Sequence, residues 1–231
     1  MPGRVTVYSF GMSQNSVRPE IALREKGVEY ERVEVSLLAG EHRKPPLSQL
    51  TPRMQVPTVV YASGEGDEPI VVWESIATIR FIDDLFPDPP LMPPASELRQ
   101  RARALMRIEE FQAKLDGKNV FGSVAFRKLT REQLGDRVDA LLGELPRWDT
   151  YVREAGGHYL AGETFSLADI AVFPLLLHFE VLGYDYAKHT PALADYIARC
   201  KARKSVQDTG WMERFFAFAK AREVAPVLSD S

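Results

Sequence analysis

The spacing of apolar and polar residues predicts short strands and helices in the first part of the chain. Residues 4–10 are rich in β-branched and aromatic side chains and predict a strand. Residues 16–26 predict a helix that has Pro19 in its first turn and stops at Gly27. Residues 33–37 then alternate apolar with polar side chains, as a half-buried strand does.

A predicted hairpin and one more helix complete this part. Residues 58–62 and 70–73 are β-rich runs on either side of the turn-forming segment SGEGDEP. From Ser75 to Phe86, apolar residues recur every three or four positions and predict a helix. The order β-α-β followed by β-β-α predicts a thioredoxin-like α/β domain, in which helices cover a four-stranded mixed sheet.

A proline-rich segment separates this domain from the rest of the chain. Residues 87–94 read PDPPLMPP, and proline both fixes φ and lacks the backbone donor that helices and central strands need. We therefore predict a thioredoxin-like domain over residues 1–86, a proline-rich linker over 87–96 and an all-helical domain over 97–231.

The pattern after the linker is helical throughout. Residues 98–109 and 131–155 carry apolar side chains at steps of three and four, which predicts two amphipathic helices. Ser166 opens the sequence SLAD, which resembles a capping box with Asp169 in place of the usual Glu or Gln. The Thr-Pro pair at 190–191 is a second helix start, with a hydroxyl at the cap and proline at the first helical position.

Composition narrows the chemistry. The 231 residues hold 29 basic and 32 acidic side chains, and a net charge of −3 gives no general attraction to nucleic acid or to an anionic membrane. The N-terminus lacks a secretory signal pattern and no stretch reaches the ~18 apolar residues of a membrane span, so we expect a cytoplasmic protein. The chain has a single cysteine, Cys200, so we expect no internal disulfide. The histidines lack the spacing of metal ligands, so we expect no metal site.

Two dipeptides in the first part suit the recognition of a peptide-like ligand. Val56-Pro57 opens a predicted strand. A cis proline here would expose the Val56 amide and carbonyl to an extended ligand, whereas a trans proline would simply mark an edge strand. Glu74-Ser75 stands where a strand meets a helix. The helix N-terminal amides and Ser75 suit a carboxylate and Glu74 suits an ammonium group, although the local sequence by itself favours Ser75 as a plain N-cap.

The loop before the helix at 16–26 is the third candidate. Hydroxyl or amide groups of Ser13, Asn15 and Ser16 at a helix N-terminus can donate to a sulfur anion, and the helix dipole favours the same charge. Without a ligand thiol these residues would be turn and capping residues.

Together these stretches make the chain resemble the glutathione transferases over nearly its full length. The matching stretches are VYSFGMSQNSVRPEIALREKGVEYERVEV, GEHRKP, TPRMQVPTVV, VVWESIATIRFIDDLFP and FSLADIAVFPLL. The resemblance implies that glutathione is a cosubstrate and that no cofactor is bound. It also implies that Val56, Pro57, Glu74 and Ser75 bind glutathione, that Gln55 and His42 contact its glycine end with Arg53 as a neighbour, and that Asp169 serves folding.

The loop is most similar to those of the bacterial Nu-class enzymes and the yeast nitrogen-regulator relatives. That likeness implies that Ser13 and Asn15 flank the glutathione thiol. The loop also resembles the bacterial β-aryl etherases, which would emphasise Asn15 and Ser16, while the tyrosine-type classes make Tyr8 a minor candidate. The loop has neither the cysteine of omega-like enzymes nor the SSC sequence of maleylacetoacetate isomerases.

The resemblance therefore implies a homodimeric glutathione transferase that acts in detoxification. Its helical domain would form the pocket for a hydrophobic, electrophilic small molecule, and no nucleic acid or membrane partner is expected. A glutathione-dependent disulfide or peroxide reductase, an aryl-ether-cleaving enzyme and a non-catalytic glutathione-binding homologue are the alternatives.

Overall fold

The computed structural model describes residues 3–64 and 66–229, and these residues form two compact units. The first unit extends to residue 91 and also includes residues 207–215, while the second holds residues 92–206 and those from 216 on. The change of unit after residue 91 falls within the predicted linker at 87–96. The return of residues 207–215 to the first unit differs from the prediction, which gave all of 97–231 to the helical domain.

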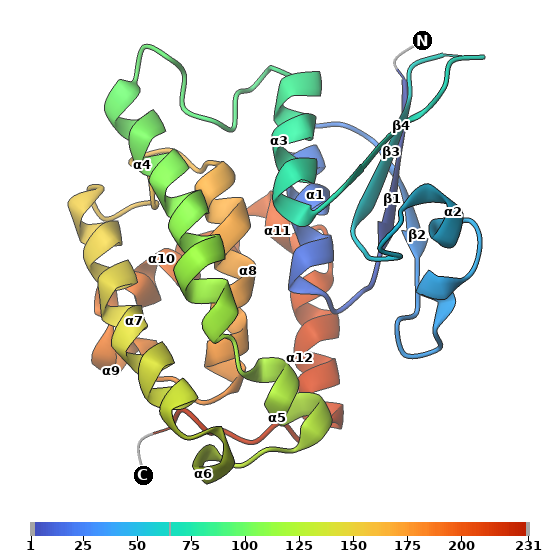
Figure 1. Cartoon of the computed structure of the whole chain (residues 1–231). Coiled ribbons are helices and arrows are strands. Elements are labelled where there is room, and N and C mark those ends of the chain that lie inside the picture. The colour runs from blue at the N-terminus through green and yellow to red at the C-terminus, as the bar shows by residue number, and fades with distance from the viewer. Residues whose placement is uncertain (1–2, 65, 230–231) are drawn as a thin grey trace. The chain divides into compact units, whose positions relative to one another are not determined.

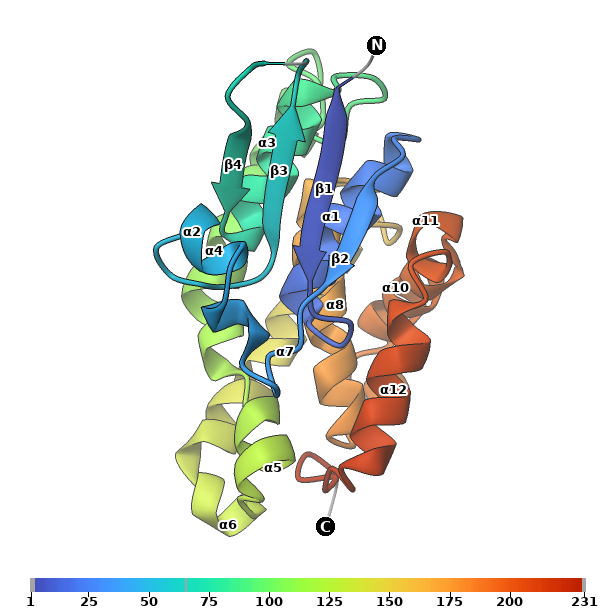
Figure 2. The same cartoon turned by 90° about the vertical axis from the view of Figure 1, so that its right-hand side faces the viewer.

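The first unit contains the predicted thioredoxin-like fold. Its sheet has the strand order β2-β1-β3-β4, with β2 parallel to β1 and the other neighbouring pairs antiparallel. Figures 1 and 2 show that α1 and α3 cover one face of this sheet, while α2 lies at the opposite face. The elements in chain order are β1 (Arg4–Ser9), α1 (Gln14–Glu25), β2 (Glu31–Glu34), a 3₁₀ turn (Glu41–Arg43), α2 (Leu47–Leu50), β3 (Thr58–Ala62), β4 (Ile70–Trp73) and α3 (Ser75–Leu85).

Helix α1 and strand β2 differ by two residues or more from the sequence prediction, since β2 begins at Glu31 instead of residue 33. Helix α1 begins at Gln14 instead of residue 16, because Ser13 takes the N-cap position. Strand β2 ends at Glu34, so the alternation that continues to Leu37 lies beyond the ladder. Glu65, in the predicted turn between β3 and β4, lies outside the described residues.

The second unit is a helical bundle around α8, whose residues 167–179 are all buried. Helices α4 and α10 pack on α8, and α7 packs on α10 (Figure 1). Its helices are α4 (Leu98–Glu110), α5 (Phe121–Arg127), α6 (Arg131–Leu134), α7 (Asp136–Glu154), α8 (Leu167–Val181), α9 (Tyr186–His189), α10 (Pro191–Ala202) and α11 (Lys204–Gln207), and α12 (Trp211–Ala221) begins in the first unit and ends in the second.

The helix predicted over 131–155 is two helices. Gly135 separates α6 from α7 with φ 52° and ψ −136°, a conformation that L side chains rarely adopt and that glycine permits. The helix start at 190–191 also differs in detail. Proline is at the first position as predicted, but the amide of Leu193 donates to Asp149 Oδ1 of α7 (3.0 Å), and the hydroxyl of Thr190 makes no capping bond.

Asp169 closes the capping box of α8 as predicted. Its Oδ2 accepts from the amide (2.8 Å) and the hydroxyl (2.9 Å) of Ser166, and its Oδ1 accepts from the amide of Leu160 (2.9 Å). The carboxyl is completely buried, and desolvation raises its pKa to about 6 despite these three bonds. Asp169 therefore ties the start of the core helix to the preceding loop.

Within residues 3–64 and 66–229, none of the helices has both the length and the apolar character that a membrane span requires.

Candidate glutathione site

A pocket of about 450 Å³ lies in the first unit, between the β1–α1 loop, the segment that precedes β3 and the start of α3. It brings together eight of the ten predicted site residues from four separate parts of the chain, and it adds two apolar residues. Its lining consists of Ser13, Asn15, Leu37, His42, Met54, Gln55, Val56, Pro57, Glu74 and Ser75.

Ser13 caps α1 and points a hydroxyl at the pocket. Its Oγ accepts from the amides of Asn15 (3.2 Å) and Ser16 (3.3 Å), which are orphan donors of the first turn. The oxygen is thus occupied as an acceptor at the positive end of a 12-residue helix. Because no described residue accepts the hydroxyl proton, Ser13 can donate it to a ligand in the pocket.

A buried arginine behind the pocket orients two of the lining side chains. Arg18 is 1% exposed, and its guanidinium donates through one nitrogen to Asn15 Oδ1 (2.6 Å) and to Ser75 Oγ (2.8 Å). Since guanidinium only donates, Asn15 must turn its oxygen toward Arg18, which leaves its Nδ2 as a donor for a ligand. Arg18 thus sets the donor direction of both residues at once.

The start of α3 offers amides to an anion. The helix begins at Ser75, and Glu74 stands in the N-cap place with φ 67° but makes no side-chain capping bond. The interpretation of Ser75 as a plain N-cap is therefore wrong. Because its oxygen accepts from Arg18, the hydroxyl of Ser75 has its proton to offer, and the first-turn amides lack intrahelical acceptors. Glu74 is exposed and carries the negative charge that an ammonium group would need.

The opposite side of the pocket is formed by the chain before β3. The Val56–Pro57 peptide bond is cis, and β3 begins after it at Thr58. The buried hydroxyl of Thr58 donates to the carbonyl of Gln55 (2.9 Å), and this bond stabilises the turn around Pro57. Val56 therefore lies just outside the strand ladder, with its main chain beside the pocket.

His42 supplies a ring nitrogen that the described residues do not satisfy. It lies in the 3₁₀ turn Glu41–Arg43 and lines the pocket, and its Nδ1 is buried with no hydrogen-bond partner among the residues that the structure describes. Buried polar atoms are normally paired, so this nitrogen suits a ligand group.

Three predicted candidates lie elsewhere. Ser16 is completely buried, and its hydroxyl oxygen accepts from the amide of Phe10 (3.2 Å), so its contact is structural. Arg53 is exposed and does not line the pocket. Tyr8 is a half-buried residue of β1 and is likewise not part of the lining.

The residues that sequence reasoning missed are Arg18, Leu37 and Met54. Arg18 had a usable signal, because it follows Asn15 by three residues and such pairs share one face of a helix. Leu37 and Met54 carry no chemical signal of their own. Their places in the pocket follow from the path of the chain between β2 and β3, which local sequence does not encode.

Comparisons with known proteins identify the family of the chain. Residues 3–84 match the model of the glutathione S-transferase N-terminal domain, and residues 127–204 match that of the C-terminal domain. The chain is 31% identical to a stringent starvation protein A homolog of Pasteurella multocida, over 80% of each chain. It is 26% identical to a maleylacetoacetate isomerase of Emericella nidulans, over 90% of this chain and 92% of that one.

A solved structure extends the likeness to the whole fold. The glutathione S-transferase of the Antarctic clam Laternula elliptica superposes with a TM-score of 0.76 at 25% identity, over 91% of this chain and 94% of that one. Both domain models, the full-length relatives and the pocket at the predicted positions lead to one conclusion: the chain belongs to the glutathione S-transferase family.

Proposed function

We propose that the pocket binds glutathione and that the protein is a glutathione transferase, which activates the bound thiol for attack on a hydrophobic electrophile. One observation carries this proposal. The Arg18 guanidinium holds Asn15 and Ser75 in fixed donor orientations, while Ser13 is held as a donor by the amides that it caps. Three neutral donors that face one pocket suit a ligand that carries an anionic sulfur as well as a carboxylate.

The lining residues match glutathione along its length. The α-carboxylate of its glutamyl end would accept from Ser75 and the first-turn amides of α3, and Glu74 would take the ammonium group. The cysteinyl main chain would lie beside Val56, and the glycine carboxylate would reach His42 and Gln55. Ser13 and Asn15 then remain for the sulfur.

The proposed reaction begins with ionisation of the thiol. The thiol releases its proton to water, and donation from Ser13 and Asn15 stabilises the thiolate. A pKa lowered by two units corresponds to about 2.7 kcal/mol. The sulfur lone pair then forms a bond to an electrophilic carbon, and either a leaving group departs with its electrons or an activated double bond takes up a proton. We further propose that the protein acts in the cytoplasm and in detoxification, as the family resemblance implies.

A panel of acceptors tests the reaction type. A chlorinated arene, an aryl ether, a hydroperoxide, a glutathione mixed disulfide and a maleyl-type cis double bond separate conjugation, ether cleavage, reduction and isomerisation. The isomerisation arm is included because of the relative from Emericella nidulans. We expect conjugation with the arene, together with an ultraviolet thiolate band when glutathione binds near neutral pH. Binding without turnover on any arm would favour the non-catalytic alternative.

Ser75→Ala is expected to raise the Kd for glutathione about tenfold and to change kcat less than threefold. The substitution removes a donor to the glutamyl carboxylate, far from the sulfur, and one hydrogen bond to a charged group is worth about 1.5–3 kcal/mol. Isothermal titration and steady-state rates measure the two quantities. Ser63→Ala, which removes an exposed hydroxyl in the same unit, is the control. A loss of kcat at unchanged Kd would contradict the assignment of Ser75.

We also propose that the protein is a homodimer. Helix α4 leaves large apolar side chains in solvent, with Leu98 72%, Leu105 41% and Met106 49% exposed. Sedimentation equilibrium should give twice the chain mass of 26.0 kDa. Leu98→Glu with Leu105→Glu should reduce it to one chain, whereas Leu38→Glu, at a leucine that is 58% exposed in the first unit, should not. A monomeric wild type would refute the dimer.

A further inference from the structure

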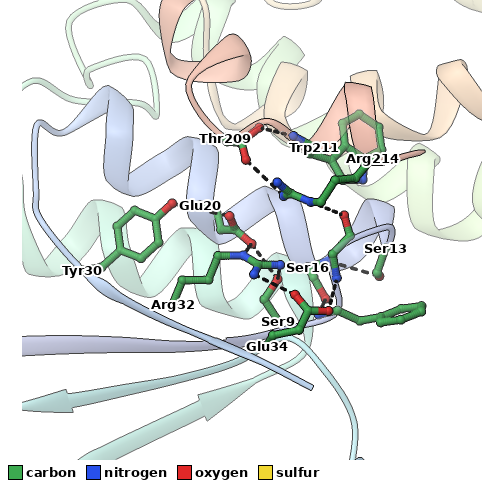
Figure 3. A network of polar contacts seen from close by, with 12 residues as sticks. Ser9, Ser13, Ser16, Glu20, Tyr30, Arg32, Glu34, Thr209, Trp211 and Arg214 are labelled. Atoms are coloured by element: carbon green, nitrogen blue, oxygen red, sulfur yellow. Dashed lines mark hydrogen bonds and ion pairs between the residues drawn. The ribbon is translucent and has the colours of Figure 1, made fainter. Parts of the chain in front are cut away.

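We propose that Arg214, in the C-terminal segment 207–215, is a positioning residue for the thiol-binding loop. Its guanidinium donates to the carbonyl of Gly11 and thereby restrains the loop that carries Ser13. Figure 3 shows Arg214 reaching the loop from one side, with Glu34 on the other. The inference rests on the proposed role of Ser13 as donor to the sulfur.

The peptide groups of Gly11 are held from two sides. Its N–H donates to Glu34 Oε1 (2.9 Å), and its carbonyl accepts from Arg214 Nε (3.1 Å). The fit is close, because a Cβ on Gly11 would lie 3.2 Å from both Arg214 Nε and Glu34 Oε2, and these side chains would have to shift by a few tenths of an ångström to admit it. The two holding residues come from β2 and from the first turn of α12, so loop and C-terminal segment form one packed arrangement within the first unit.

Both holding residues are themselves anchored. A second nitrogen of Arg214 donates to the carbonyl of Thr209 (3.0 Å), so the guanidinium bridges its own segment and the loop. Glu34 Oε2 pairs with Arg32 (2.7 Å), whose Nε donates to Glu20 Oε1 (3.1 Å). Glu20 is 2% exposed and lies in α1, so the polar network in Figure 3 ends in the core of the unit.

The anchored peptide lies two residues before Ser13. The amide of Ser13 donates to the carbonyl of Phe10 (2.9 Å), and the amide of Phe10 donates to Ser16 Oγ (3.2 Å). The loop therefore has fixed backbone on each side of Ser13, and Arg214 supplies the contact that comes from outside β1, β2 and α1. Catalytic donors must be held to within about 0.5 Å of their working position. Loss of the contact to Gly11 should therefore reduce the rate of the reaction more than the affinity for the ligand.

The test compares Arg214→Gln with Lys220→Gln, which removes the same charge from an exposed site on the same helix. Hydrogen exchange of residues 9–17 is measured without glutathione, and we expect at least threefold faster exchange in Arg214→Gln only. With glutathione, we expect its thiol pKa on the enzyme to rise by about half a unit to one unit and kcat to fall roughly tenfold, which is about 1.4 kcal/mol, while Kd stays within twofold.

Arg214→Lys is a second variant that keeps the test informative if Arg214→Gln does not fold. Lysine keeps the charge but cannot donate to Gly11 and Thr209 in the fixed geometry of a guanidinium, so its exchange rates should lie between those of the wild type and Arg214→Gln. Wild-type exchange rates in both folded Arg214 variants would overturn the proposal. If the wild type failed to ionise glutathione, the proposed function would fail, whereas faster loop exchange in Arg214→Gln would still support the positioning role.

Discussion

Replacing Ser13 with alanine is expected to lower kcat for glutathione conjugation about 100-fold while the Kd for glutathione changes little. The alanine removes a hydroxyl that is held in place by two helix amides and that, in the proposed function, donates to the developing sulfur anion. Loss of one preorganised donor to an anion in an oxyanion hole costs 10²–10³ in rate, and we take the lower end because Asn15 remains. Steady-state kinetics and ultraviolet titration of the bound thiol measure the two effects.

Ser13→Thr is the matched control for this prediction. Threonine keeps the hydroxyl and the N-cap, so both kcat and the pKa of the bound thiol should stay close to those of the wild type. The alanine variant also loses the cap, which costs about 1 kcal/mol of stability, and thermal melts separate that loss from the kinetic one. If Ser13→Ala and Asn15→Ala both kept full activity and an unchanged thiol pKa, the catalytic assignment would be wrong.

Asp169→Ala is expected to lower the free energy of unfolding by about 3 kcal/mol or more. Alanine leaves the buried amides of Leu160 and Ser166 without an acceptor, and each such group costs about 1–3 kcal/mol. The fully buried helix α8 loses its capping box in the same step. Urea denaturation followed by circular dichroism measures the change.

Asp169→Asn provides the control and a pH signature. The amide keeps one acceptor but turns an NH₂ toward the donors of Ser166, so an intermediate loss is expected. Burial raises the pKa of Asp169 from 3.8 to about 6, so between these values the native state holds a proton that the unfolded state releases. The stability of the wild type relative to Asp169→Asn should therefore be highest below pH 4 and should fall as the pH rises through 6. An alanine variant as stable as the wild type would refute the role of Asp169 in folding.

Most of the fold could be predicted from the sequence because its signals are local. The strands at 58–62 and 70–73 and the helix from Ser75 follow from runs of β-branched residues and from isoleucine spacing. The interruption at Gly135 was not predicted, because apolar spacing continues across it and only the backbone angle reveals the break. Likewise, Asp149 caps α10 from another helix, and residues 44 positions apart carry no mutual signal in a single sequence.

The candidate site divides in the same way. Four site residues were predictable because each lies at the end of a helix or strand: Ser13, Asn15, Val56 and Ser75. At such ends some backbone groups lack partners within the element, and the residue types that serve there can be recognised in the sequence. Ser16 has the same residue type and nearly the same position as Ser13, yet its hydroxyl faces inward to Phe10, and only the helix phase decides which of the two reaches the pocket. Arg214 contacts Gly11 across 203 positions, a relation that no local pattern contains.

The discontinuity of the first unit has a consequence for synthesis of the protein. Residues 207–215 belong to this unit, but a ribosome adds them only after the whole of residues 92–206. A nascent chain that has completed β1 to α3 can form the sheet, but it lacks the arginine that fixes the loop before Ser13. Because domains generally fold as they emerge, the sheet forms during translation before the contact between Arg214 and Gly11 is available. The β1–α1 loop is therefore held at Gly11 only once residues 207–215 have joined the unit, whereas the residues that line the pocket have all been added by the start of α3.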